Sequence, residues 1–293
     1  MSGLVLVTRA AGGGQGATGR QVAELLLGQG IPVRAFVRTL DERAERLREL
    51  GAEVVAGDLR DIGDVGPAIA GADRVFFTYP VADGLLDATA AVATAAQRAG
   101  IRRLVEVSQL RPRPTAVSPR TRQHWLSEQI FDWAGVGAIH LRATVFYENI
   151  RVLVSLAAAG RLEVPLGDPG NAIPLVSARD VARLAAALLA RPDRPAEPAY
   201  HLVGAVPTIA ELVADFGAAL GTPLEYVPVD EPRWREWARG QGWPEHAIEH
   251  LSRLWRVFAG TADRDPDLWR VTDAMERVTG TGPESVRDFL LAG

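Results

Sequence analysis

The sequence LVLVTRAAGGGQGATG, residues 4–19, decides the fold of this chain. Its first five residues, ending at Thr8, are apolar enough to form a buried strand, and a glycine-rich turn follows them. The turn leads into a helical pattern over residues 20–27, which ends at Gly28 and Gly30. A strand, a glycine turn and a helix in this order open a dinucleotide-binding fold. We therefore expect a diphosphate at the start of the helix, facing its free N–H groups and its positive dipole end.

Three glycines of the turn are spaced three residues apart, and each suits one task. Gly13 would let the chain turn off the strand, Gly16 would let a pyrophosphate approach bare backbone, and Gly19 would let the helix pack closely on the sheet. The turn is longer than usual, and Arg9 stands where such turns ordinarily have a glycine, so Gly12 is an alternative to Gly13. The spacing alone is equally typical of a flexible surface turn, and the flanking strand and helix favour the nucleotide.

The composition is that of a globular protein that can bury a large core. The chain has 293 residues, of which 47% are hydrophobic and 23% charged, with a net charge of −4. That charge argues against a general nucleic-acid or anionic-membrane surface. No apolar run approaches the roughly 20 residues that span a bilayer, and no export signal is evident. We expect a cytoplasmic protein with no membrane and no nucleic-acid partner.

Two residue types are missing, and their absence limits the chemistry. The chain has no cysteine, which excludes disulfides, thiolate nucleophiles and zinc–thiolate sites. All 32 basic residues are arginine. Schiff-base chemistry, a P-loop lysine and a Tyr–Lys catalytic pair are therefore excluded as well. A GC-rich genome would explain the arginine bias, but the chemical consequence is the same.

Strands and helices alternate along the first part of the chain. This alternation is typical of an α/β protein with a doubly wound parallel sheet, which binds ligands beyond the carboxyl ends of its strands. A sixth strand is expected over residues 138–143, after a loop over 111–122 and a helix over 124–134. The earlier strands are expected at residues 4–8, 32–38, 51–56, 73–78 and 103–108, and the helices at 20–27, 40–50, 62–70 and 85–99.

The end of the second strand indicates which cofactor binds. An acidic residue at this point would hold the 2′-hydroxyl of a ribose, whereas an arginine suits a 2′-phosphate. The strand ends in Arg38, with Arg43 close behind it. The sequence therefore favours NADP(H) over NAD(H), unless Arg38 is only a solvated strand end.

Further side chains fall at the same edge of the sheet. Asp58, just past the third strand, could accept from an adenine amino group beside Leu59, or could cap the next helix. Thr78 and Tyr79 end the fourth strand, and Ser108 ends the fifth. We expect these residues, with Thr8, to line the cofactor.

The chain changes character after residue 150. We expect residues 1–150 to form the nucleotide-binding domain, with 172–203 adding to its sheet, and residues 151–171 and 204–293 to form a C-terminal substrate lobe. Helices are expected over 150–160, 177–189 and 208–220, the last with Thr208 and Glu211 as a capping box. Five of the seven tryptophans lie between Trp234 and Trp269, as the lining of a cleft, an interface or an ordinary core.

Several of these stretches together resemble the NmrA-like branch of the atypical short-chain dehydrogenase/reductases. The resemblance covers nearly the whole chain and implies a Rossmann domain, a smaller C-terminal lobe of α+β type and NADPH as the usual ligand. Its members include quinone and isoflavone-type reductases and redox-sensing regulators. The matching stretches are the glycine turn, residues 51–58, 122–128 and 143–149, and the closing segment 271–289.

The chain also departs from this family. Many relatives have a lysine near the nicotinamide ribose, and that position is His124 here. The tyrosine of ordinary short-chain dehydrogenases would fall on Arg120, and the proline that commonly follows the sixth-strand arginine is Ala143. The usual acid pair is therefore missing.

Four side chains remain as candidates for catalysis. His124 is the best proton donor, because a histidine pKa of about 6.5 lies near working pH. Tyr79, Ser108 and Tyr147 could donate hydrogen bonds to a substrate oxygen. As an alternative, His124 merely packs at the start of its helix.

Two further histidine positions have simpler interpretations. His140 lies inside a strand and is expected to be structural. His246 and His250 are four residues apart on a helix, a metal-binding spacing, but no third ligand is evident, so we expect no metal.

Three hypotheses about the function follow. The first is an NADPH-dependent reductase of a quinone or another carbonyl or enone small molecule. The second is a protein that senses NADP(H) with little or no turnover and passes the signal to a protein partner. A biosynthetic enzyme performing a non-redox step is a third. Each has a small-molecule ligand, and each is compatible with a homodimer.

Overall fold

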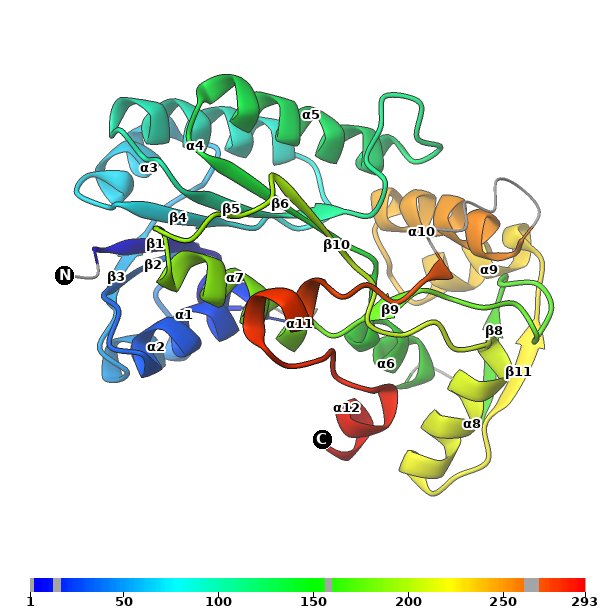
Figure 1. The fold of residues 1–293 in the computed structure, drawn as a ribbon. Coiled ribbons are helices and arrows are strands. Elements are labelled where there is room, and N and C mark those ends of the chain that lie inside the picture. Colours follow the sequence, from blue (N-terminus) through cyan, green and yellow to red (C-terminus); the bar gives the residue numbers. More distant parts are fainter. Residues whose placement is uncertain (1–2, 13–16, 156–159, 261–268, 293) are drawn as a thin grey trace.

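The computed structural model describes residues 3–12, 17–155, 160–260 and 269–292. A seven-stranded parallel sheet forms its centre, in the order β10-β6-β5-β4-β1-β2-β3 (Figure 1). The strands are β1 (Val5–Thr8), β2 (Val33–Val37), β3 (Glu53–Ala56), β4 (Arg74–Phe77), β5 (Leu104–Gln109), β6 (Ala138–Ala143) and β10 (Ala199–Leu202). The predicted α/β doubly wound fold is thus confirmed. Its strands could be recognised in the sequence because strands covered on both faces are nearly continuous apolar runs.

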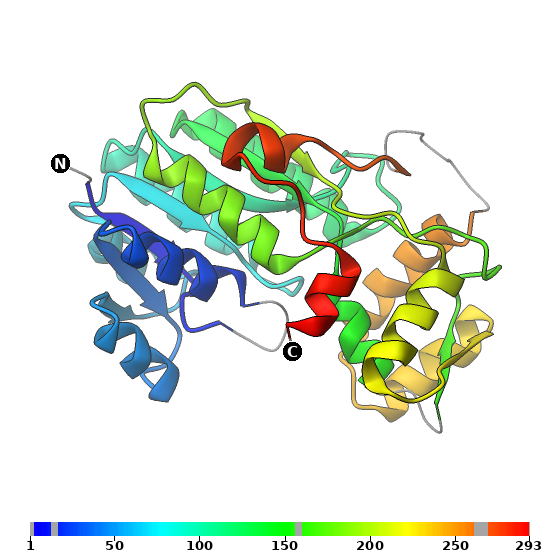
Figure 2. The same cartoon turned by 60° about the horizontal axis from the view of Figure 1, so that its bottom comes forward.

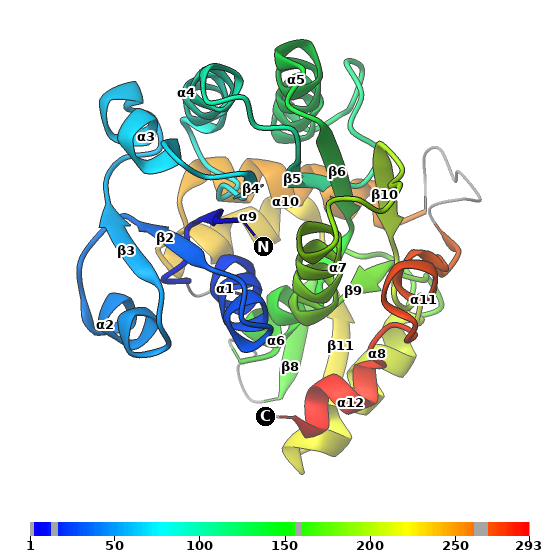
Figure 3. The same cartoon turned by 60° about the vertical axis from the view of Figure 1, so that its left-hand side comes forward.

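Helices cover both faces of the sheet (Figure 3). One face carries α1 (Thr18–Gly28), α2 (Glu42–Glu49) and α7 (Ala178–Ala190), and the other carries α3 (Ile62–Ile69), α4 (Leu85–Arg98) and α5 (Pro119–Ala134). Each layer encloses its own hydrophobic cluster with the sheet. Because every connection between parallel strands crosses a face, all carboxyl ends meet at one edge.

The start of α5 differs from the prediction. The loop expected over residues 111–122 ends at Ser118, whose hydroxyl accepts the N–H of Arg120 and caps the helix. Pro119 occupies the first helical position, where its missing N–H costs nothing. This Ser-Pro start was readable in the sequence.

A third hydrophobic cluster lies beyond the sheet edge (Figure 2). It includes α6 (Tyr147–Ser155), α8 (Ile209–Leu220), α9 (Glu231–Gly240), α10 (Glu245–Phe258) and α12 (Val286–Leu291). Trp234 and Trp255 are fully buried there with ring centroids 6.2 Å apart, so the tryptophan group is an ordinary core. The capping box of Thr208 and Glu211 is present at α8.

The remaining elements are short. β8 (Arg161–Val164) pairs with β11 (Glu225–Pro228), and β7 (Val145–Phe146) pairs with β9 (Leu175–Val176). Of the strands in the described segment 172–203, only β10 joins the central sheet. The helix α11 (Ala274–Thr279) lies between α10 and α12 in the chain. Among the described residues, no helix is long and apolar enough to cross a membrane.

Candidate functional site

Within the described residues, the start of α1 has no side-chain cap. Ala17, the residue before the helix, has no side chain that could cap it, so the first N–H groups have no side-chain partner there. A Cβ atom on Gly19 would lie 2.6 Å from the Thr8 carbonyl oxygen, so only glycine lets α1 pack this closely on β1. Gly13 and Gly16 lie outside the described residues.

The described part of the turn explains its unusual sequence. Arg9 has a φ of 53°, the left-handed conformation in which a glycine was expected. Gly12 has a φ of +76°, and a Cβ atom on it would lie 2.9 Å from the Ala17 side chain. Gly12 is therefore a required glycine of the turn. The choice between Gly12 and Gly13 as the first glycine of the motif stays a prediction, because Gly13 lies outside the described residues.

Arginines surround a carboxylate at the ends of β2 and β3. Arg38 is paired with Asp58 at 3.2 Å, and its side chain is 70% exposed. Arg60 donates from its Nε to Asp58 Oδ1 at 3.0 Å, and this bond, with Arg38 nearby, holds the pKa of Asp58 well below its usual value. Asp58 does not cap the next helix, because Asp61 does so. The cluster presents two guanidinium groups and one carboxylate at the sheet edge.

Two other predicted residues lie near this cluster. The Tyr79 hydroxyl donates to the Asp83 carbonyl at 3.2 Å, and burial raises its pKa, while Arg60, Asp58 and Arg38 all act on it electrostatically. Tyr79 thus belongs to the Arg38–Asp58 end of the edge. The guanidinium of Arg43 instead binds Asp41, the cap of α2.

Two predicted residues build the edge with their side chains. The Thr8 hydroxyl accepts the Thr78 N–H at 2.9 Å and donates to the Thr78 carbonyl at 3.2 Å, which ties the end of β1 to the end of β4. The Leu59 side chain is 7% exposed and packs in the core. A contact of Leu59 with a nucleotide would therefore come from its backbone.

The end of β5 and the start of α5 bring together unpaired polar atoms. Ser108 is 2% exposed and His124 is 4% exposed. Within the described part of the chain, neither the Ser108 Oγ nor either ring nitrogen of His124 has a hydrogen-bond partner. Because burying such groups without a partner costs about 1–3 kcal/mol each, this is where a ligand is expected to complete the structure.

The protonation state of His124 corrects one expectation. Burial lowers its pKa to about 4, so the ring is neutral at pH 7. The predicted role as a proton donor with a pKa near working pH is therefore wrong. A neutral imidazole can still donate one hydrogen bond and accept another.

Sequence reasoning missed a hydrogen-bonded group beside these residues. Thr121 donates to Gln109 Oε1 at 2.7 Å, which turns the Gln109 amide nitrogen toward His250 Nε2, 3.4 Å away. His250 Nε2 then accepts, and Nδ1–H faces the Ser118 Oγ at 2.8 Å. Burial above all, and then the neighbouring His124 and Arg120, lower the pKa of His250 to about 3. His250 on α10 thus joins the C-terminal cluster to the sheet edge through both of its ring nitrogens.

Tyr147 has another task than the one predicted. Its hydroxyl donates to the Glu284 carbonyl at 3.0 Å, and its ring packs on Phe289 with the centroids 5.2 Å apart. Burial raises its pKa far above the usual value. Tyr147 is therefore a core residue, and the prediction that its hydroxyl donates to a substrate is wrong.

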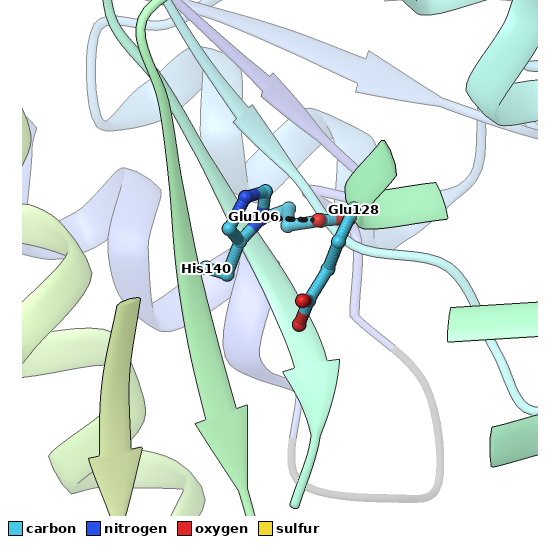
Figure 4. Close-up of side chains that lie close together, drawn as sticks. All are labelled: Glu106, Glu128 and His140. Carbon is cyan, nitrogen blue, oxygen red and sulfur yellow. Dashed lines mark hydrogen bonds and ion pairs between the residues drawn. The ribbon is translucent and has the colours of Figure 1, made fainter. Parts of the chain in front are cut away.

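A buried ionic group fixes α5 against β5 and β6 (Figure 4). His140 Nδ1 lies 2.6 Å from Glu106 Oε1, and Glu128 receives two hydrogen bonds from Arg142, at 2.6 and 3.0 Å. Burial opposes the charge on His140, but Glu106 outweighs it and raises the pKa of His140 to about 9. Glu106, Glu128 and His140 are close enough to hold a cation, yet all three already have protein partners. The structural role expected for His140 fits this arrangement.

The described residues fit a bound dinucleotide. Open N–H groups at α1 suit the diphosphate, Arg38 suits a 2′-phosphate, and the unpaired atoms of Ser108 and His124 suit the nicotinamide end. These groups follow one edge of the sheet in the strand order β2, β1, β4, β5.

Known proteins share this architecture. Over 285 residues the chain is 28% identical to the NAD(P)H azoreductase of Xenophilus azovorans, covering 96% of each chain. The solved NADPH-dependent quinone oxidoreductase QOR2 of Escherichia coli, complexed with NADPH, is 20% identical over 99% of each chain, with a TM-score of 0.84. NmrA, a negative transcriptional regulator, is 20% identical over 99% of this chain and 95% of its own, with a TM-score of 0.78.

A family model settles the assignment. The model described as NAD(P)H-binding matches residues 13–192, which is more than half of the chain. The match includes residues 13–19 of the glycine turn, together with Arg38, Asp58, Ser108 and His124. The chain belongs to the NAD(P)H-binding family, and its fold is that of the NmrA-like atypical short-chain dehydrogenase/reductases.

Proposed function

We propose that this protein is an NADPH-dependent reductase of quinones and related electron-poor acceptors, including azo compounds. The observation that carries the proposal is a pair of buried residues, Ser108 at the end of β5 and His124 in α5, whose polar side-chain atoms have no partner among the described residues. The 28% identity with an azoreductase along the whole chain supports it. The nicotinamide would supply a hydride, and the protein would hold the ring and exclude water.

The candidate side chains favour one class of acceptor. His124 has a lowered pKa, and Tyr79 and Tyr147 have raised ones, so none of the three is an acid near pH 7. A simple ketone needs a proton as the alkoxide forms, whereas a quinone delocalises the charge it accepts over its ring. Ser108 and His124 would donate hydrogen bonds to that charge. The site therefore suits quinones, enones and azo compounds better than simple ketones.

The cofactor should be NADPH. Arg38 is largely exposed, and its bond to Asp58 is the kind of surface ion pair that is worth about 0–1 kcal/mol. A 2′-phosphate carries more charge than a carboxylate and can accept from Arg38 while Asp58 stays bound to Arg60.

The test is NADPH consumption with a naphthoquinone, an azo dye and a simple ketone. We expect turnover with the first two and very little with the ketone. Ser108→Ala and His124→Phe should each lower kcat/KM by about 10- to 100-fold, as loss of a placed donor does. Ser155→Ala, a serine on the exposed part of α6, is the matched control and should change nothing.

A sensor of NADP(H) is the second candidate, favoured by one observation. Ser108 and His124 are almost wholly covered, which suits holding a cofactor without admitting substrate. Tight NADPH binding without consumption across the panel would favour the sensor and rule against the reductase. Turnover with no redox change in the cofactor would indicate the third candidate, a non-redox enzyme.

A further inference from the structure

A cavity of about 250 Å³ lies outside the group formed by Ser108, His124 and His250. It is enclosed by the first turn of α1, the helix α6, the start of α7 and the C-terminal helix α12. Its charged lining consists of Arg20, Glu148, Arg151, Arg179 and Glu284. At this volume it would take a ligand smaller than a drug-sized molecule, whose sites span about 300–1,000 Å³.

Glu284, which lines the cavity, has a buried acceptor that no other described residue uses. Arg179 Nη1 binds Glu284 Oε1 at 2.7 Å, and the Glu284 side chain is only 7% exposed. Its other oxygen, Oε2, is buried and has no hydrogen-bond partner. The Glu284 backbone is held on both sides, since its N–H donates to Asp180 Oδ2 at 2.7 Å and its carbonyl accepts from Tyr147. A fixed carboxylate oxygen is thus available for a donor.

The same cavity contains a guanidinium available for an anion. Arg151 lies over the Phe289 ring at 4.2 Å from its centroid. Among the described residues, no carboxylate is within ion-pair distance of it, although Glu148, which also lines the cavity, interacts with it electrostatically at longer range. Arg20, across the cavity on α1, has a single contact of 3.6 Å with Glu24, and both side chains are 44% exposed. An exposed pair of this kind is weak and would yield to a ligand.

We propose that this cavity binds a small zwitterion, an α-amino acid. Its ammonium group would donate to Glu284 Oε2, its carboxylate would accept from Arg151 and Arg20, and its side chain would meet Phe289 and Ala292. An anion alone would leave the Glu284 oxygen unpaired, and a cation alone would face the arginines. Both charges are needed to satisfy the lining.

The position of the cavity connects the ligand to the cofactor. Ala17 and Arg20 line it, and they belong to the segment whose N–H groups are expected to face the diphosphate. A ligand that holds α1 against α12 would therefore change the affinity for NADPH, and NADPH would change the affinity for the amino acid by the same factor.

The experiment is calorimetric titration of the full chain, without cofactor, with glycine, alanine, glutamate and arginine. Acetate and ethylamine serve as probes that carry one charge each. We expect saturable binding of at least one amino acid and much weaker binding of both single-charge probes. Glu284→Gln and Arg151→Gln should each weaken binding at least about tenfold, or 1.4 kcal/mol. The controls Glu249→Gln and Arg253→Gln, a surface pair on α10, should keep it.

Three results would overturn the proposal: no saturable heat with any amino acid, single-charge probes that bind as tightly, or binding that survives in both variants. Arg151→Gln keeps the test valid if Glu284→Gln fails to fold, because Arg151 makes no ion pair that the fold would lose. Strict competition between the amino acid and NADPH would also overturn it, because the cavity would then belong to the cofactor. The titration needs no turnover, so it stands apart from the outcome of the reductase assay.

Discussion

Replacing Arg38 with alanine should weaken NADPH binding by about 10- to 150-fold and leave NADH binding unchanged. The range corresponds to the roughly 1.5–3 kcal/mol of a hydrogen bond to a charged group. The substitution should cost little stability, so the loss of affinity should not come from unfolding. Arg38 is 70% exposed, and Asp58 keeps its bonds from Arg60 when Arg38 is removed.

Fluorescence titrations measure the affinities of the wild type and the variant for NADPH and NADH at one ionic strength. Repeated at higher salt, they should show a smaller difference in NADPH affinity between wild type and variant, because salt screens an exposed charge pair. Arg46→Ala, an exposed arginine of α2, is the matched control and should bind both nucleotides as the wild type does. If NADPH and NADH affinities fall together, or if neither falls, Arg38 does not read the 2′-phosphate and the cofactor assignment is wrong.

Three further results are expected. Because the pKa of His124 is about 4, the rate of NADPH oxidation should show no transition near pH 6.5, and a bell centred there would contradict the neutral ring. His140 has a folded pKa of about 9, above the unfolded value near 6.5, so its bond to Glu106 stabilises the protein below pH 6.5 and is lost as pH rises through 9. Denaturant unfolding should show this as a fall of up to about 3 kcal/mol that is missing in His140→Gln, and an equal fall in that variant would exclude the pair as its cause. Tyr147→Phe should lower the free energy of unfolding by about 1–3 kcal/mol and leave kcat unchanged, since its hydroxyl serves Glu284; a large loss of kcat at normal stability would restore it as a catalytic candidate.

The sheet could be predicted because its signals are local. Each buried parallel strand is a short apolar run, and each is followed by a helical pattern that ends in glycine or a charged turn. The task of Gly19 followed from its place in the strand–turn–helix unit, and a Cβ atom there would indeed meet the Thr8 carbonyl at 2.6 Å. The edge position of Asp58 and Ser108 followed from the strand ends alone.

The rest of the site depends on contacts between distant parts of the chain. His250 meets Ser118 across 132 residues and Gln109 across 141, and no local pattern encodes such a meeting. The four-residue spacing of His246 and His250 is compatible with a metal site, whereas the structure shows His250 in hydrogen bonds to Ser118 and Gln109. Tyr147 follows β6 by a few residues, where no periodicity fixes the direction of a side chain.

The protonation states of the buried histidines could not be predicted from the sequence, because they depend on burial and on neighbouring charges. The ordinary pKa of histidine suggested that His124 was an acid, but the ring is 4% exposed and has no partner to stabilise its charge. His140 is as deeply buried, and yet Glu106 makes its charged form the stable one. The same residue type thus has opposite states on adjacent elements, for reasons that only the packing shows.

The most direct measurement is a titration of the purified chain with NADPH, followed by the fluorescence of the bound nucleotide, for the wild type and for Gly19→Ala. A Cβ atom at residue 19 would push α1 away from the Thr8 carbonyl and displace the N–H groups expected to face the diphosphate. The account predicts saturable binding to the wild type and a clear loss of affinity in a folded Gly19→Ala variant. A wild-type protein that binds neither NADPH nor NADH, or a variant that binds as tightly, would contradict it.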